Sequence, residues 1–146
     1  MTKPRNATVS ISRRFQFCAG HRVYRHESKC RHLHGHNYVA HIHLTAASLD
    51  DRGRVLDFSQ VKTIVGGWLD DNWDHAMILC ADDEEALRAV RMVHGQKLYV
   101  MTQNPTAENM ASELHVRVNA LLSSLRVRCT HVVLEETENC SARFEA

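Results

Sequence analysis

Apolar and polar residues alternate along two segments in the first third of the chain. Between residues 9 and 17 the odd positions are mostly apolar, and this period of two predicts a half-buried strand. Continuing the register puts Ala19 and His21 on the same face. A second strand is predicted over residues 36–46, where the positions that share a face with His36 are apolar, namely Tyr38, Ala40, Ile42 and Leu44.

A helix is predicted to follow a turn at residues 51–53. It begins at Leu56 or Asp57 and ends near residues 70–75, and its apolar residues recur at roughly helical spacing: Val61, Ile64, Val65, Trp68 and Leu69. Residues 81–96 predict a second helix, because acidic residues come first and basic residues later, which suits the helix dipole.

The last third of the chain predicts a helix between extended segments. The helix starts after Pro105, with Thr106 as N-cap and Glu108 in the first turn. Short extended segments are predicted at the sequences KLYVM and SARFEA, and a long strand at RVRCTHVVLEET. The chain of 146 residues is therefore predicted to be a single α+β domain, residues 1–146, with an antiparallel sheet covered by helices on one side.

Composition narrows the class of protein. The formal charge is +1 and there is no long block of like charge, so nothing favours a nucleic-acid or membrane partner. No apolar run approaches the ~20 residues of a membrane-spanning helix, and the N-terminus lacks the apolar core of a signal peptide. The five cysteines contain no CxxC pair, which favours free thiols and a cytoplasmic protein.

The sequence CRHLHGH at residues 30–36 is the densest cluster of chemically active side chains. His34 and His36 are two apart, so on a strand both imidazoles project from one face, and His21 is positioned to add a third nitrogen. Three neutral imidazoles with an open fourth position are the ligand set of a catalytic zinc site. A solvated, histidine-rich turn is the alternative.

Three further features carry chemical interest. Cys30 is flanked by the cations Lys29 and Arg31, so it is a candidate metal ligand, base or nucleophile, or an inert thiol. Asp74 can fix the tautomer of a neighbouring proton-transfer histidine, His75, although a helix-end aspartate beside a surface histidine explains the pair equally well. Glu136 shares a face with apolar residues, where a carboxylate needs a partner.

Six stretches, read together, resemble the 6-pyruvoyl-tetrahydropterin synthase / 6-carboxy-tetrahydropterin synthase family. They are FQFCAGH (15–21), CRHLHGHNY (30–38), GRVLDFSQVK (53–62), WDH (73–75), NPTAENMA (104–111) and EET (135–137). They occur in the family's order and span nearly the whole chain. The resemblance implies a tunnelling fold, with a four-stranded antiparallel sheet, helices on one face and the order ββααββ. It also implies a homohexamer of two trimers with active sites at subunit interfaces.

The resemblance assigns roles to the residues at the matching positions. His21, His34 and His36 would hold Zn²⁺. Cys30 would abstract a proton, with Asp74 and His75 as its relay. Glu136 would anchor the pterin, since a carboxylate accepts two parallel hydrogen bonds from its amidine-like edge. Thr106 and Glu108 are weaker candidates for lining the pterin pocket, and a plain helix cap explains Thr106 as well.

The substrate so implied is 7,8-dihydroneopterin triphosphate. The three-residue gap between Cys30 and HGH resembles the bacterial queuosine-pathway enzymes, which favours a 6-carboxy-tetrahydropterin product with release of acetaldehyde and triphosphate. Cations near the cluster are candidates for binding the triphosphate: Arg22, Arg25, Lys29 and Arg31. Two departures from the family are the additional segment 81–94 and Ala76, which stands where the family often has lysine.

Three other functions stay open from the sequence. The nearest is a 6-pyruvoyl-tetrahydropterin synthase using the same site. A non-catalytic, zinc-stabilised pterin-binding protein would be favoured by loss of Cys30 or His75, and both are present. A nucleic-acid-binding zinc module would need a basic face and a second closely spaced ligand pair, and the sequence has neither.

Overall fold

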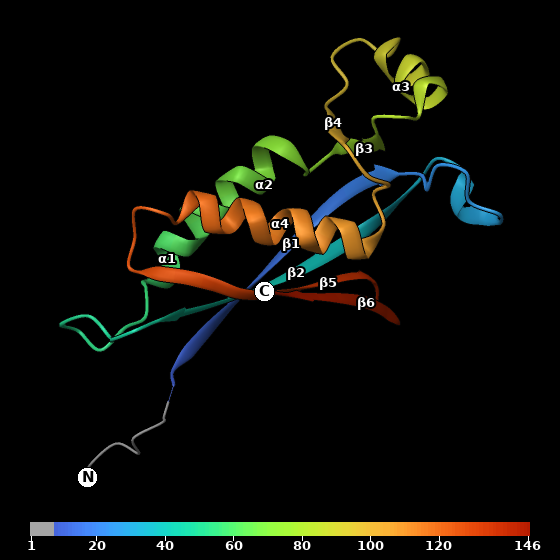
Figure 1. The fold of residues 1–146 in the computed structure, drawn as a ribbon. Helices are drawn as coiled ribbons and strands as arrows, with labels where there is room; N and C mark the ends of the chain where they lie inside the picture. Colours follow the sequence, from blue (N-terminus) through green and yellow to red (C-terminus); the bar gives the residue numbers. More distant parts are fainter. Residues whose placement is uncertain (1–7) are drawn as a thin grey trace.

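One twisted sheet organises the chain, and a computed structural model describes it over residues 8–146 (Figure 1). Its two longest strands, β1 (Ser10–His21) and β2 (His34–Ala46), are antiparallel along their whole length. β5 (Val127–Thr137) pairs with the other edge of β2, and β6 (Cys140–Glu145) pairs with β5. The predictions of an antiparallel sheet at the two ends of the sequence are thus confirmed.

The prediction of a four-stranded sheet is wrong in its count, because the sheet has six strands in the order β4-β3-β1-β2-β5-β6. β3 (Ala76–Cys80) pairs in parallel with the end of β1, and β4 (Leu98–Met101) pairs in parallel with β3. β3 is a short, continuous apolar run, AMILC, which has no alternation to identify it as a strand. The helix predicted in the additional segment is present as α3 (Glu84–Arg91), and it connects these two parallel strands.

Helices cover one face of the sheet, as the sequence predicts (Figure 1). The first helical segment consists of α1 (Phe58–Val61), a π-helical stretch η2 (Lys62–Gly66) and α2 (Gly67–Asn72). The other covering helix is α4 (Ala107–Leu121). The core between sheet and helices includes fully buried side chains from both layers: Tyr38, Ile42, Leu44, Leu69, Trp73, Leu114 and Leu134.

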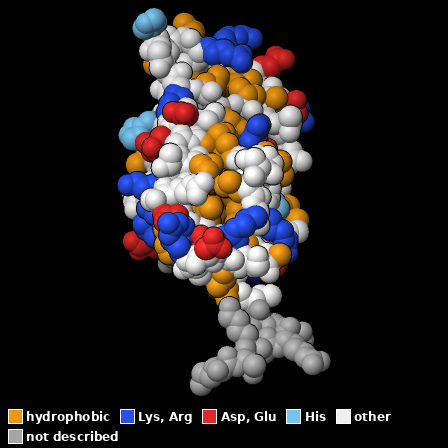
Figure 2. All heavy atoms as spheres, turned by 90° about the vertical axis from the view of Figure 1, so that its left-hand side faces the viewer, with side chains coloured by type: hydrophobic (Ala, Val, Ile, Leu, Met, Phe, Trp, Pro, Cys, Tyr) orange, Lys and Arg blue, Asp and Glu red, His pale blue; other side chains and the backbone are white. Residues whose placement is uncertain are grey.

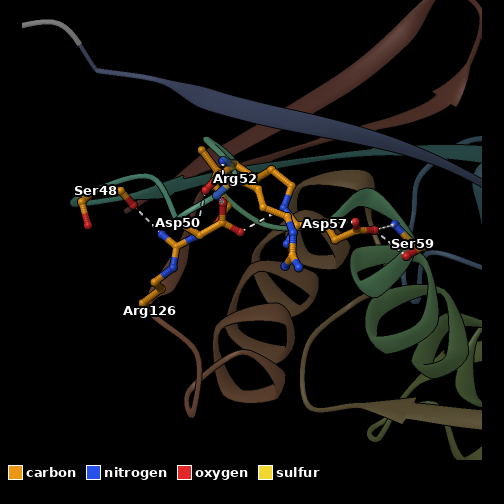
Figure 3. Close-up of polar contacts among 8 residues, drawn as sticks. Ser48, Asp50, Arg52, Asp57, Ser59 and Arg126 are labelled. Carbon is orange, nitrogen blue, oxygen red and sulfur yellow. Dashed lines mark hydrogen bonds and ion pairs between the residues drawn. The ribbon is translucent and has the colours of Figure 1, made fainter.

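The turn between β2 and α1 is fixed by charged side chains (Figure 3). Asp50 accepts hydrogen bonds from the backbone N–H groups of Arg52 and Arg54, both at 2.9 Å. The Arg54 guanidinium bridges Asp50 and Asp57, and Asp57 caps α1 by accepting from the Ser59 N–H. The stretch GRVLDFSQVK is therefore explained by its role in holding this turn.

The surface combines charge with exposed apolar side chains. On the face shown in Figure 2, apolar side chains gather in a band that charged side chains border. Across the described residues, the large apolar side chains that are exposed are Val9, Leu33, Phe58, Met92, Val93, Val100 and Val116. Within the same part of the chain, no helix is long and apolar enough to cross a bilayer.

Candidate active site

Strand register brings three histidines together at one end of the sheet. His21 lies opposite His34, and His36 lies opposite Ala19, so all three side chains share the helix-covered face. One ring nitrogen from each histidine lies within 4.8 Å of the others. The closest pair is His21 Nε2 and His34 Nε2, at 3.1 Å.

Backbone carbonyl groups orient two of these imidazoles. His21 Nδ1 donates to the Pro105 carbonyl at 2.7 Å, and His34 Nδ1 donates to the His32 carbonyl at 2.7 Å. This arrangement leaves the Nε2 lone pairs directed at one another, as in histidines that ligate a metal. His36 Nε2 is buried and has no hydrogen-bond partner in the described chain. A buried nitrogen without a partner is costly, and a metal ion would satisfy it. The three histidines therefore fit a divalent metal.

Burial shapes the electrostatics of the cluster. Desolvation lowers the pKa of His21 and also that of His36, so both favour the neutral form that a metal requires. The Glu136 carboxylate lies over the cluster, 3.7 Å from His36 Nε2 and 4.0 Å from His21 Nε2. Tyr38 forms the floor beneath His36, with its ring centroid 5.4 Å away. The site thus has an apolar floor and one acidic wall.

Gly35 allows the two ligand-bearing strands to pack closely. A Cβ atom at this position would lie 3.0 Å from the Ala19 carbonyl oxygen, which is backbone and cannot turn away. An alanine here would push β1 and β2 apart between the pairs that carry His21, His34 and His36.

Asp74 and His75 form a hydrogen-bonded pair at the edge of β1. His75 Nδ1 lies 2.8 Å from Asp74 Oδ2, and the Cys18 N–H donates to Asp74 Oδ1 at 2.9 Å. Burial opposes ionisation of Asp74, but these bonds outweigh it and lower the pKa of the carboxyl. The His75 backbone has φ of 60°, and its side chain is 78% exposed. The pair is fixed at its base and open to solvent at the imidazole.

A cleft of about 710 Å³ extends beside this pair. Its lining includes His75, together with Cys18 and Asn37, whose positions alternate with those of the residues that face the helices. Leu33 and Val93, both exposed apolar residues, line the same cleft. His34 and His36 also line this cleft, so the imidazole of His75 opens into a partly apolar cleft beside the histidine cluster.

Cys30 lies in a short 3₁₀ turn, η1 (Lys29–Arg31), in the loop between β1 and β2. It is half-buried, and its carbonyl accepts from the Val23 N–H at 2.8 Å. Within residues 8–146, the side-chain hydrogen bonds of Asp74 go to Cys18 and His75, and none reaches the Cys30 thiol. A single chain thus does not join the three residues of the predicted relay.

Thr106 is the N-cap of α4, and its side chain accepts from the Asn109 N–H at 3.2 Å. Glu108 is exposed in the first turn of the helix, where its carboxylate interacts favourably with the helix dipole. These contacts explain both residues structurally. Neither residue makes a hydrogen bond with the histidine cluster in the described chain.

Sequence reasoning missed several residues that position the site. Asn104 binds both backbone groups of Tyr24, accepting from its N–H at 2.7 Å and donating to its carbonyl at 3.0 Å. Lys97 donates to the Asp74 carbonyl at 2.7 Å and so supplies a cation beside the Asp74–His75 pair, although residue 76 is alanine. Asn104 lies in a motif that the sequence singles out, but no local pattern links Lys97 to Asp74.

Comparison with known proteins identifies a family for this chain. A family model described as 6-pyruvoyl tetrahydropterin synthase matches residues 10–146. The 6-carboxy-5,6,7,8-tetrahydropterin synthase of Rickettsia bellii (strain RML369-C) is 41% identical over 133 residues, which cover 90% of this chain and 96% of the relative. The enzyme of the same name from Aquifex aeolicus (strain VF5) is 29% identical over 157 residues, covering 92% of this chain and 96% of the relative.

Two solved structures share the fold. An uncharacterized protein from Wolinella succinogenes superimposes with a TM-score of 0.81 and 26% identity, covering 96% of this chain and 99% of its own. The 6-pyruvoyl tetrahydropterin synthase of Caenorhabditis elegans superimposes with a TM-score of 0.69 and 23% identity, covering 96% of both chains. The tunnelling fold is thereby confirmed, with the sheet widened to six strands.

Proposed function

The chain belongs to the 6-pyruvoyl tetrahydropterin synthase family, and from that premise we propose that it makes 6-carboxy-5,6,7,8-tetrahydropterin. The proposed substrates are 7,8-dihydroneopterin triphosphate and one water molecule, and the other products are acetaldehyde and triphosphate. The observation that carries the proposal is the set of three converging histidines, one with a buried and unpartnered nitrogen. The 6-carboxy names of the relatives support this product, which would serve the synthesis of queuosine and other 7-deazaguanines.

His21, His34 and His36 are the residues that we propose hold zinc. Three neutral imidazoles leave a coordination position open, which is the ligand set of catalytic zinc sites. When bound, zinc would acidify the hydroxyl groups of the substrate side chain and polarise the carbonyl that develops there. The carbonyl groups of Pro105 and His32 keep the imidazoles oriented throughout.

Protein side chains would move the protons and anchor the pterin. In our proposal the Cys30 thiolate takes a proton from the substrate side chain, and His75, held by Asp74, relays protons to and from solvent. Glu136 would bind the 2-amino and N3 edge of the pterin. Its carboxylate lies 3.7 Å from His36 Nε2 and 4.0 Å from His21 Nε2, so a pterin bound to it would lie beside the histidine cluster.

We propose that the complete site forms between copies of the chain, in a hexamer of two trimers. The Asp74–His75 pair makes no hydrogen bond with Cys30 in the described chain, and its cleft is bordered by the exposed apolar residues Leu33 and Val93. Exposed apolar patches favour protein contacts. A neighbouring copy would bring its own Cys30 and histidine cluster to the Asp74–His75 pair.

The proposal is tested by mass spectrometry of the products from 7,8-dihydroneopterin triphosphate. Zinc-loaded wild type is compared with Cys30→Ala, and Cys140→Ala is the control, since Cys140 is an exposed thiol on β6. We expect acetaldehyde and the 6-carboxy product from wild type and the control, and neither product from Cys30→Ala.

Two results would contradict this function. A 6-pyruvoyl product would keep the site but replace the reaction. No turnover by a folded, zinc-replete sample would remove the substrate assignment and favour a pterin-binding protein.

A further inference from the structure

A second, smaller pocket of about 360 Å³ lies in the loop that joins the two ligand-bearing strands. It is lined by Arg22, Val23, Tyr24, Arg25, His26, Arg31, His32 and Glu85. Three arginines and two histidines thus surround one carboxylate. This composition suits an anionic ligand, provided that the cations are not already neutralised by the protein.

Arg22 is already neutralised. Its guanidinium binds both oxygens of Asp83, at 2.6 and 2.5 Å, and Asp83 has no exposed surface. The hydrogen bonds that Arg22 donates to Asp83 raise the pKa of Arg22 above its already high ordinary value. Glu85, which is 88% exposed, also approaches Arg22 at 3.3 Å. The structure therefore removes Arg22 from the cations that the sequence offers for binding phosphate.

Arg25 and Arg31 keep their charge available. Neither guanidinium forms an ion pair or hydrogen bond with another residue of the described chain, and both residues are exposed. The Arg25 guanidinium lies over the Tyr24 ring, 5.0 Å from its centroid, which limits the directions it can take. Two unneutralised guanidinium groups on one pocket are suited to bidentate binding of phosphate oxygens.

The loop that presents these arginines is held in place. Asn104 binds both backbone groups of Tyr24, at 2.7 and 3.0 Å. The next residue, Arg25, has φ of 62°, a left-handed conformation that is unfavourable for a non-glycine residue. Such a conformation persists only where the surroundings impose it, so the Arg25 backbone is held by its neighbours.

The pocket lies next to the proposed metal ligands along the chain. Arg22 directly follows His21, and the His32 carbonyl orients His34 through its Nδ1 at 2.7 Å. Consecutive Cα atoms are about 3.8 Å apart. Arg22 and His32, which both line the pocket, are therefore a chain neighbour of one metal ligand and a hydrogen-bond partner of another, so the pocket lies next to the histidine cluster.

We propose that this pocket binds the triphosphate group of the substrate, with Arg25 and Arg31 as the residues that contact its oxygens. The identity of the ligand rests on the function proposed above. The anion site itself rests on the two guanidinium groups, of Arg25 and Arg31, that the loop presents without an ion-pair partner in the described chain. Glu85 acts against binding, because its carboxylate faces the same pocket. Lys29 does not line the pocket and has no part in the contact.

Inorganic tripolyphosphate tests the pocket without turnover. Its affinity is measured by titration calorimetry on the protein as purified and again after chelation, because tripolyphosphate also binds zinc. We expect Arg25→Gln combined with Arg31→Gln to weaken binding at least about tenfold in both samples, since two charged contacts are lost. Glu85→Gln should strengthen binding. Arg88→Gln, which removes a charge from the neighbouring helix outside the pocket, should leave it within about twofold.

Three outcomes would overturn the assignment. They are unchanged affinity in the double variant, an equal loss in Arg88→Gln, and loss of all binding when the metal is removed. With substrate, the double variant should raise KM and keep kcat. Binding that depends on Arg25 and Arg31 in a protein that forms no product would refute the proposed reaction but not the anion pocket.

Discussion

The ion pair between Arg22 and Asp83 joins the α3 segment to the end of β1, next to His21. Asp83 accepts two hydrogen bonds from Arg22 and a third from the Ala86 N–H at 3.1 Å, which caps α3. Asp83→Asn keeps the cap, because asparagine caps helices as well as aspartate does. The substitution removes the charge that neutralises Arg22 and also replaces the Oδ2 atom that accepts from Arg22 Nε by an NH2 group, which cannot accept.

The cost of this change follows from burial. Breaking a fully buried pair costs about 3–5 kcal/mol. The Arg22 side chain is 19% exposed and Asp83 is not exposed at all, so we expect about 2–3 kcal/mol. In a chain of this length, 1 kcal/mol shifts Tm by about 2–4 °C, so Asp83→Asn should lower Tm by about 5–10 °C.

The loss should depend on pH in a defined direction. Hydrogen bonds from Arg22 hold the pKa of Asp83 below its ordinary value, so the folded carboxyl binds a proton less tightly than the unfolded one. Its contribution to stability is then fully present above the unfolded pKa of about 3.9 and is lost as pH falls through the lowered folded pKa. The Tm difference between wild type and Asp83→Asn should be constant from about pH 5 to 8 and shrink below about pH 4.

Circular dichroism melts at one protein concentration and one metal content make the comparison, because association and metal both raise Tm. Asp82→Asn is the control, since Asp82 is the exposed neighbour with the same charge. The reasoning would be refuted by an Asp83→Asn Tm equal to that of wild type, or by an equal loss in Asp82→Asn.

Two further predictions concern the candidate site. His36→Gln should weaken zinc binding by more than about 100-fold in equilibrium dialysis. Loss of a residue that only orients a ligand costs roughly 10–100-fold in metal affinity, so a larger loss identifies His36 as a ligand. Unchanged zinc content would show that His36 is not a ligand. Thr106→Ala should lower the free energy of unfolding by about 1 kcal/mol through loss of the α4 cap, while Thr106→Asn should keep it. A raised KM in Thr106→Ala with unchanged stability would instead indicate pterin contact.

The histidine cluster was predictable from the sequence because the period of two along a strand determines which side chains share a face. The alternation in β1 and β2 predicts that His21, His34 and His36 share a face, and the register brings their nitrogens together. Strand β3 was not predictable in this way, because five consecutive apolar residues lack a period that separates strand from helix.

Contacts between distant segments were not predictable from local patterns. Asp83 and Arg22 are 61 residues apart, and nothing near either residue indicates its partner. Tyr24 and Asn104 are 80 residues apart, so the role of Asn104 appears only when the loop folds back onto the start of α4. The relay of Cys30 with His75 is a third case, because no hydrogen bond within residues 8–146 joins the Cys30 thiol to Asp74 or His75.

The pairing of β1 with β2 has a consequence for how this protein tolerates insertions and deletions. Alternation along a strand means that one residue added between Phe17 and His21, or between His34 and Tyr38, would turn the histidines beyond it to the opposite face. The loop over residues 22–33 has no such constraint, and each doubling of its length would cost only about 0.6 kcal/mol in closure entropy. Changes of loop length can therefore alter what binds beside the histidines while the histidine cluster itself stays intact.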